Sequence, residues 1–230
     1  MRFIAHGTSG IELSIDDQIS SPRVIKEIEA GTYEQREMTF TQRIVSKGDR
    51  VLELGAGLGF VSTVINRRVN VGFYAAVEAD ARLIPNIKRS HEKNGIRGVE
   101  VINSAFVADQ ETLTLGFVEF GVSQVFWGSG ISKAGQDNVT TVSVEAESAS
   151  EYIHKHSINV LVLDIEGGEL DLFRHLDLGG VEKIIMEIHP NVFGQAGTRE
   201  IFNILDRNNF SYNAPNSAGP VVTFEKITSV

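Results

Sequence analysis

The stretch Val51-Leu52-Glu53-Leu54-Gly55-Ala56-Gly57-Leu58-Gly59-Phe60-Val61-Ser62 decides the fold of this chain of 230 residues. It contains an apolar run with an acid near its end, then three alternating glycines, then the start of an amphipathic pattern. This order predicts a strand, a tight turn and a helix. Alternating glycines let the backbone approach a ligand, and the free amides of the helix start point toward it. A nucleoside-containing cofactor is the expected ligand.

The residue after the third glycine narrows the choice of cofactor. A dinucleotide-binding loop would place a glycine at position 60, where this chain has Phe60. The pattern resembles motif I of class I S-adenosylmethionine (SAM) methyltransferases, whose cofactor has no pyrophosphate. That resemblance implies cofactor contacts from the residues Glu53, Gly55, Ala56, Gly57 and Gly59. An ordinary strand-to-helix turn is the alternative for the loop taken alone.

Composition and charge restrict the class of protein. Hydrophobic residues make up 42% of the chain and charged residues 22%, as is typical of globular proteins. No apolar run approaches the roughly 18 to 20 residues of a membrane span, and residues 1–8 lack the apolar core of a signal peptide. We therefore expect a cytoplasmic protein without a membrane partner.

The net charge of -9 disfavours a nucleic-acid partner, because such binding needs clustered Lys and Arg. The absence of cysteine excludes disulfides, thiolate metal sites and cysteine nucleophiles. The length allows one well-buried α/β domain. We expect residues 1–46 to form a helical extension and residues 47–230 the core.

Several patterns precede the glycine-rich stretch. Residues 1–20 alternate weakly and predict a short strand or an extended arm, which could serve contacts in a homo-oligomer. Ser21-Pro22 is typical of a helix start, and Gly31 of its end. Thr32-Tyr33-Glu34-Gln35 has the pattern of a capping box and predicts a second helix through about Val45.

Two further strand ends follow the glycine-rich stretch. Glu78 closes the strand of residues 72–80, at the spacing that places an acid on the ribose hydroxyls, with Ala79 beside it. Asn103-Ser104-Ala105 follows the strand of residues 99–102 and could meet the adenine, with Phe106 as an apolar wall. The alternatives are a solvated strand end and a polar strand cap.

The middle of the chain predicts two strands, residues 113–118 and 139–144, around a polar segment of residues 119–138. Such a connection is long enough to suggest a functional loop. Within it, Phe126-Trp127-Gly128-Ser129-Gly130 is interpreted as a mobile cover over the acceptor site. A surface insertion without a role is the alternative.

The stretch of residues 158–170 is the most hydrophobic predicted strand and ends in three carboxylates around two glycines. A nearly continuous apolar run indicates a central parallel strand. Asp164 would therefore lie where cofactor and acceptor meet. Neighbouring carboxylates and burial raise the pKa of such a group, which suits a general base or a metal ligand.

Leu163-Asp164-Ile165-Glu166-Gly167-Gly168-Glu169, followed by Ile184-Ile185-Met186-Glu187-Ile188-His189, resembles the signature of FkbM-type methyltransferases. This family contains SAM-dependent O-methyltransferases that act on polyketide and sugar hydroxyls. The similar region runs from about Tyr33 to His189 and includes Tyr33-Glu34. The chain departs from the family pattern in carrying Glu53 in place of Asp, and Val144-Glu145 in place of a Leu-Asp pair.

The resemblance implies a doubly wound α/β domain with a mostly parallel seven-stranded sheet and an antiparallel last strand. The carboxyl-terminal pattern agrees, with a helix over residues 198–208 and strands over 210–212 and 221–224. The expected reaction transfers a methyl group from SAM to a hydroxyl of a small molecule, sugar or glycan. A nucleotide-dependent oxidoreductase and a non-catalytic SAM-binding protein are the alternatives.

Two residues are candidates for the base that accepts the hydroxyl proton. Asp164 is the first, and His189 is the second because an imidazole accepts a proton near neutral pH. Catalysis without a metal is favoured. Asp164, Glu166 and Glu187 could alternatively hold Mg²⁺, a hard cation that prefers carboxylate oxygens.

Overall fold

The computed structural model describes residues 2–126, 129–131, 135, 137 and 139–227. Its centre is a seven-stranded sheet of order β11-β12-β10-β9-β3-β4-β5. The strands are β3 (Arg50–Leu54), β4 (Phe73–Val77), β5 (Val99–Ile102), β9 (Val160–Leu163), β10 (Lys183–Glu187), β11 (Phe210–Tyr212) and β12 (Val221–Lys226). Neighbours from β5 to β10 are parallel, whereas β12 is antiparallel to both β10 and β11. The predicted sheet with an antiparallel last strand is confirmed.

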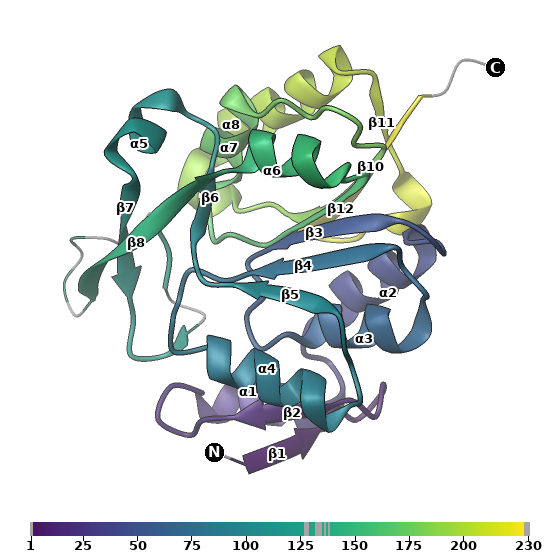
Figure 1. Ribbon diagram of the computed structural model, residues 1–230, viewed down its shortest axis with the longest axis vertical. Helices are drawn as coiled ribbons and strands as arrows, with labels where there is room; N and C mark the ends of the chain where they lie inside the picture. The colour runs from purple at the N-terminus through teal and green to yellow at the C-terminus, as the bar shows by residue number, and fades with distance from the viewer. Residues whose placement is uncertain (1, 127–128, 132–134, 136, 138, 228–230) are drawn as a thin grey trace.

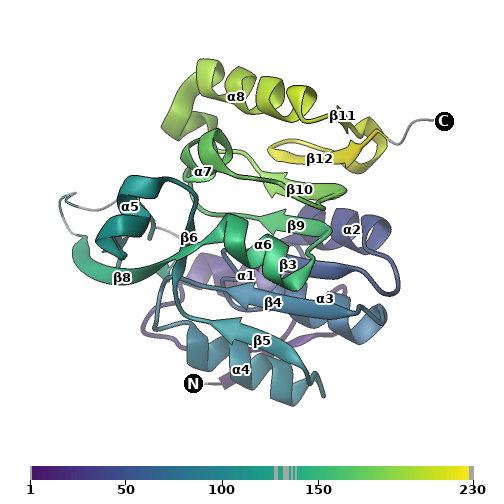
Figure 2. The same cartoon turned by 45° about the horizontal axis from the view of Figure 1, so that its top comes forward.

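Helices cover both faces of this sheet (Figure 1, Figure 2). One face carries α2 (Gln35–Ile44), α3 (Phe60–Arg68) and α4 (Ile84–Lys93), and the other carries α6 (Ala149–His156), α7 (Glu169–His175) and α8 (Pro190–Arg207). Successive strand residues point to opposite faces. Val51 accordingly packs in the first core cluster and Leu52 in the second. Because both faces are buried, the strands are apolar without alternation, as the sequence showed.

The amino-terminal segment contains more than a single strand or arm. β1 (Arg2–Ala5) and β2 (Glu12–Ile15) form an antiparallel hairpin, so the extension of residues 1–46 is not only helical. The Ser14 N–H donates to Ser90 Oγ at 2.9 Å, which fastens the hairpin to α4. The hairpin therefore extends the layer of helices on one face of the core.

The two predicted amino-terminal helices are present, but the second begins differently. Helix α1 (Pro22–Ala30) starts at the Ser21 cap and ends at Gly31 in the left-handed conformation. The predicted capping box does not form, because the Thr32 hydroxyl donates to the Glu27 carbonyl at 3.3 Å. Helix α2 begins only after Glu34, whose φ of 44° is also left-handed. Glu34 is thereby left at the helix entrance, outside the regular turns.

A smaller sheet of order β6-β8-β7 flanks the core, with β6 (Ala105–Val107), β7 (Phe117–Val122) and β8 (Thr140–Ser148). The predicted strand over residues 113–118 is wrong in its first half, because α5 (Gln110–Leu115) occupies residues 113–115. The Asp109 side chain accepts from the Thr112 N–H, and left-handed Gly116 ends the helix. A cap and a stop at the two ends outweigh the strand preference of the residues between them.

Other boundaries differ from the predictions, most of all for α8, which begins eight residues before the predicted start at residue 198. Strand β7 continues to Val122, so the long connection begins four residues later than predicted. Helix α6 starts at Ala149 because strand β8 extends to Ser148, which caps it. Helix α8 begins at Pro190, with a non-helical Gly194 inside it, and η3 (Ala214–Asn216) joins β11 to β12. Among the described residues, no helix is long and apolar enough to cross a membrane.

Candidate active site

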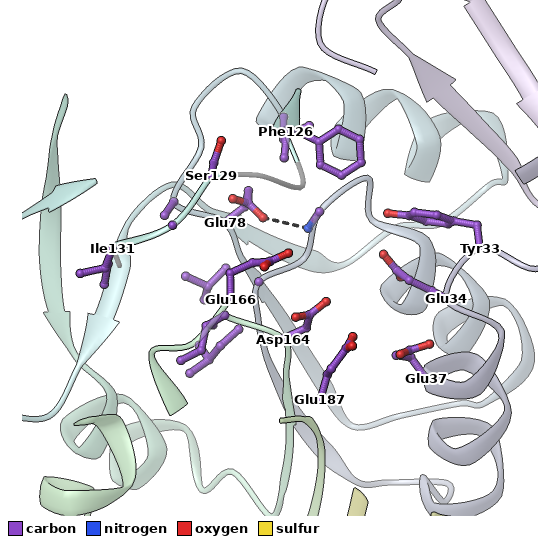
Figure 3. Close-up of a pocket in the computed structure, with 18 of the residues that line it drawn as sticks. Tyr33, Glu34, Glu37, Glu78, Phe126, Ser129, Ile131, Asp164, Glu166 and Glu187 are labelled. Atoms are coloured by element: carbon purple, nitrogen blue, oxygen red, sulfur yellow. Dashed lines mark hydrogen bonds between the residues drawn. The ribbon is translucent and has the colours of Figure 1, made fainter. Parts of the chain in front are cut away.

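A cavity of about 680 Å³ opens at the carboxyl ends of β3, β4 and β9 (Figure 3). Its walls come from the glycine-rich loop, from the ends of β4 and β9, from the entrance of α2 and from the segment around Phe126. This is the edge at which parallel α/β sheets bind ligands. The volume lies within the range of about 300 to 1,000 Å³ usual for small-molecule sites.

The glycine-rich loop packs against the end of β9. Gly55 has a φ of +84°, and a Cβ placed there would lie 1.7 Å from the carbonyl oxygen of Asp164. Gly57 is also left-handed and faces the cavity, whereas a Cβ on Gly59 would meet Ile87 of α4 at 2.9 Å. Only glycine suits these backbone angles at such close approach. The loop geometry therefore depends on Gly55 and Gly59 as packing positions and on Gly57 as a cavity wall.

Glu78 is the acid that the sequence assigned to the ribose. Its Oε2 accepts from the Gly57 N–H at 2.8 Å, and its Oε1 accepts from the Asp80 N–H at 2.8 Å. Each carboxylate oxygen can accept a second hydrogen bond. Burial raises the pKa of Glu78 to about 7. The side chain is thus held firmly at the cavity wall, with acceptor capacity left for hydroxyl groups.

Glu53 and Ala56 lie beside the large cavity. Glu53 is buried and lines an adjoining cavity of about 20 Å³. The Tyr74 hydroxyl donates to its Oε2 at 3.1 Å, and burial raises its pKa to about 8. Ala56 is also buried, and its N–H donates to the Val77 carbonyl. Neither residue is part of the large cavity's wall.

Some residues after β5 line the cavity, and one of them hydrogen-bonds to the backbone instead. Ser104, Ala105 and Phe106 line the cavity together with Ala79. The Ser104 Oγ is buried and has no hydrogen-bond partner within the described part of the chain. Asn103 is exposed, and its amide donates to the carbonyls of Glu78 and Ala79 at 2.9 and 3.1 Å. Asn103 therefore braces the strand end, while Ser104 keeps an unused polar atom at the cavity.

The segment interpreted as a cover borders the cavity. Phe126, Ser129, Gly130 and Ile131 line it (Figure 3). The Phe126 N–H donates to the Ile19 carbonyl at 3.1 Å, which ties the segment to the amino-terminal region. Trp127 and Gly128 of the same prediction lie outside the described residues.

Asp164 lies directly after β9, where its N–H donates to the Leu54 carbonyl at 2.9 Å. Its side chain lines both cavities. The Oδ1 atom is buried and has no hydrogen-bond partner among the residues that the structure describes. Burial raises the pKa of Asp164 well above its usual range, and the carboxylates of Glu187 and Glu166 add to the increase. The structure thus places a carboxyl group with a raised pKa at the cavity.

His189 lies behind Asp164 and outside the wall of the large cavity. Its Nδ1 is 3.0 Å from Glu169 Oε1, and its Nε2 is 3.7 Å from Asp164 Oδ1. Burial alone lowers the pKa of His189, but the hydrogen bond and charge of Glu169 and the other nearby carboxylates outweigh it and raise the pKa to about 9. An imidazolium therefore stands behind the catalytic candidate.

Ligand atoms of Asp164, Glu166 and His189 lie within 4.8 Å of one another. This set shares two members with the predicted Mg²⁺ alternative but has His189 in place of Glu187. Glu187 instead points across the site toward the amino-terminal helices (Figure 3). An imidazole with two carboxylates suits a transition metal better than Mg²⁺, which prefers oxygen ligands.

The amino-terminal wall was not assigned a role from the sequence. Tyr33, Glu34 and Glu37 line the cavity. Burial raises the pKa of Tyr33 and of Glu34. Figure 3 shows Glu34 and Glu37 pointing toward Asp164 and Glu187. The only signal in the sequence was the Tyr33-Glu34 pair in the family resemblance, because nothing local tells which way these side chains face.

Comparisons with solved structures agree on the fold. A ribosomal protein L11 methylase from Lactobacillus delbrueckii subsp. bulgaricus is 15% identical, with 94% of this chain and 86% of that chain covered and a TM-score of 0.53. A precorrin-6y C5,15-methyltransferase from Geobacter metallireducens is 11% identical, with 94% and 97% covered and a TM-score of 0.50. Trm5b from Pyrococcus abyssi is 13% identical, with 97% and 55% covered and a TM-score of 0.51. At these identities the likeness shows the fold alone.

The family is shown by a separate match. No curated protein matches the chain in sequence. The family model described as the methyltransferase FkbM domain matches residues 53–212, which span the glycine-rich loop, Glu78, Asp164 and His189. The resemblance derived from the motifs is thereby confirmed. The chain belongs to the FkbM family of SAM-dependent methyltransferases.

Proposed function

We propose that this protein transfers the methyl group of SAM to a hydroxyl oxygen of a small molecule or carbohydrate, with Asp164 as the base. One observation carries the proposal: Asp164 Oδ1 is buried at the cavity and lacks a hydrogen-bond partner within the described chain. An acceptor hydroxyl would satisfy this atom and deliver its proton to it.

The chain has the features needed to hold SAM, which supplies an electrophilic methyl group when bound. Gly57 leaves its face of the cavity open, and Glu78 retains acceptor sites for ribose hydroxyls. Ser104 offers an unpartnered hydroxyl beside the apolar ring of Phe106, a suitable pair of contacts for adenine. The empty acceptor and donor positions along this wall support binding of the adenosine portion.

Asp164 is a better candidate for the base than His189. Asp164 forms part of the cavity wall, whereas His189 lies behind it. With its pKa near 9, His189 is protonated at neutral pH and so has no lone pair to accept the proton. We assign His189 a positioning role, in which Glu169 orients the ring and the charge of the ring opposes the increase in the pKa of Asp164.

A small neutral or cationic acceptor agrees with the charge of the molecule. The net charge is -9, and the cavity wall contains several carboxylates around Asp164. Phosphate groups would be repelled by this field, which disfavours nucleic acids as acceptors. Some structural neighbours are named as methylases of a ribosomal protein or as Trm5b, but the shared fold carries no substrate with it.

The test is methyl transfer from radiolabelled SAM to a panel of sugars and hydroxylated small molecules. Asp164→Asn should reduce the turnover rate by about 10²- to 10⁴-fold, the usual contribution of a general base. SAM affinity, measured by calorimetry, should change little because the amide keeps the shape of the side chain. Full activity of Asp164→Asn would contradict the assignment of the base.

Metal dependence is tested in the same assay. We propose catalysis without a metal, so EDTA should leave the rate unchanged. Loss of activity with EDTA and its recovery with a divalent cation would instead assign Asp164, Glu166 and His189 to a metal site.

A further inference from the structure

We propose that the acceptor carries a protonated amine, and that the carboxylates of Glu34, Glu37 and Glu187 hold this amine next to the methylated hydroxyl. The inference rests on the proposed function, because it names the substrate class of the same site. It concerns the side of the cavity that the sequence left without a role.

The order of residues along the sheet edge places the side of the cavity with Glu34, Glu37 and Glu187 away from the proposed ribose site. Glu78 follows β4 and Gly55 follows β3, so the ribose side lies toward β4 and β5. Asp164 follows β9, and Glu187 ends the next strand, β10. Beyond Asp164 the wall therefore continues away from the adenosine portion, toward Glu187 and the entrance of α2. An acceptor that reaches Asp164 from this side meets the carboxylates first.

These carboxylates surround a second, smaller cavity. Its volume is about 20 Å³, and it adjoins the large cavity through Leu54, Gly55, Asp164 and other shared residues. A cavity of this size accepts one water molecule or a group of similar size, such as an ammonium head. Its wall contains the carboxylates of Glu34, Glu37, Glu53, Asp164 and Glu187, and no basic side chain.

Few cations lie near the cluster. Two arginines line the large cavity, and one of them, Arg23, forms an ion pair with Glu27 at 2.9 Å. The other, Arg36, lies near Glu37 and Glu187 and favours their ionised forms. The Arg36 guanidinium, together with the His189 imidazolium behind Asp164, thus faces a larger number of carboxylates, namely Glu34, Glu37, Asp164 and Glu187 (Figure 3).

The carboxyl groups of Glu37 and Glu187 both line the small cavity. Burial raises the pKa of both groups. A bound ammonium would supply positive charge and three hydrogen-bond donors to these carboxylates. Asp164 Oδ1, which is buried and has no hydrogen-bond partner in the described structure, lies on the same wall.

The ammonium group of SAM itself is the competing occupant. If it used these carboxylates, replacing them would weaken cofactor binding. If an acceptor amine uses them, replacing them weakens acceptor binding and leaves the affinity for the demethylated cofactor almost unchanged. The two possibilities therefore differ in a binding measurement that needs no catalysis.

The experiment measures binding by calorimetry to enzyme saturated with the demethylated cofactor, S-adenosylhomocysteine. The probes are two matched sets: D-glucosamine, N-acetyl-D-glucosamine and D-glucose, and kanamycin with its fully N-acetylated form. The variants are Glu187→Gln and Glu37→Gln, each nearly isosteric, with Glu29→Gln on exposed α1 as the control. Melting curves identify any variant that is not folded. If either Glu187→Gln or Glu37→Gln is not folded, the other variant alone tests the proposal.

We expect an amine probe to bind and its acetylated form not to bind detectably. Glu187→Gln and Glu37→Gln should weaken that binding by about 10-fold or more, the effect of one charge-assisted hydrogen bond. Equal binding of amine and acetylated probes, or no binding of either, would overturn the inference. Weaker cofactor binding in both variants, with amine binding unchanged, would also overturn it.

Methyl transfer to the same probes separates the two proposals. Amine binding without transfer to any hydroxyl would refute the proposed function and leave the amine site standing. Methyl transfer to neutral hydroxyl compounds without amine binding would refute the amine site and leave the proposed function standing. Methylation at nitrogen, identified in the product by NMR, would keep the amine inference and replace the proposed oxygen acceptor.

Discussion

The contact between Gly55 and Asp164 makes Gly55→Ala an informative substitution. A Cβ at position 55 would lie 1.7 Å from the Asp164 carbonyl oxygen, whereas real Cβ contacts are essentially never below 3.0 Å. The two strand ends must therefore separate by at least 1.3 Å, the difference between these two distances. Because Asp164 is the proposed base, the added methyl group acts on the backbone that positions it.

The cost follows from two contributions. The left-handed backbone, with a φ of +84°, costs a residue with a Cβ about 1 to 2 kcal/mol. The forced separation weakens the bonds from Asp164 N–H to the Leu54 carbonyl and from Gly55 N–H to the Val77 carbonyl. Each such bond contributes about 1 kcal/mol. We expect Gly55→Ala to lower the free energy of unfolding by about 2 to 4 kcal/mol.

Gly95→Ala is the matched control. Gly95 has a φ of +72°, but a Cβ there would meet nothing within 4 Å. This variant should show only the backbone cost of about 1 to 2 kcal/mol. Urea unfolding measures both variants, and calorimetry measures SAM affinity, which should fall about 10-fold or more in Gly55→Ala alone. Equal stability and equal SAM affinity of the two variants would refute the close contact.

Two further predictions concern the buried acids. Glu78→Gln should raise the dissociation constant for SAM by about 10- to 100-fold, because hydrogen bonds to a charged group contribute about 1.5 to 3 kcal/mol. Calorimetry measures this constant, with Glu29→Gln as the control. An unchanged constant would remove Glu78 from the proposed ribose site. The second prediction is a fall in stability with rising pH. In the folded protein the pKa of Glu53 is raised from 4.5 to about 8, and that of His189 from 6.5 to about 9. The folded state therefore keeps protons that the unfolded chain has lost, and the stabilisation present below the unfolded pKa disappears as pH rises through the folded pKa. Urea unfolding at pH 5, 7 and 9 should give a free energy of unfolding that decreases with pH. Glu53→Gln should gain stability relative to the wild type over that range. A wild-type free energy of unfolding that rises with pH would contradict the raised pKa values of Glu53 and His189.

Sequence patterns were sufficient for the sheet because each core strand carries its own signal. The apolar runs that end at Leu54, Val77 and Leu163 are buried on both faces, so their composition reports the environment directly. Helix α5 was missed because a cap and a terminal glycine, not the residues between them, decide its six-residue length. Local end signals carry more weight in short elements than periodicity does.

The amino-terminal wall was missed for a different reason. Tyr33 and Glu34 precede a helix, and their pattern was interpreted as part of a capping box. The left-handed backbone at Glu34 and the bond from Thr32 to Glu27 turn the chain so that Glu34 faces the cavity. That direction depends on the packing of α1, α2 and the sheet together. No pattern within a few residues of Glu34 specifies it.

The pairing of the parallel strands explains why the remaining site residues meet. Val77, Leu54, Leu163 and Met186 are paired in one row across β4, β3, β9 and β10. The next residue of each strand end gives a second row: Glu78, Gly55, Asp164 and Glu187. A shift of one residue between β3 and β9 would turn Asp164 to the opposite face and remove its contact with Gly55. The apolar residues that fix the register of the core therefore also fix the order of the proposed ribose acid, the glycine, the proposed base and the proposed amine-binding carboxylate along the cavity.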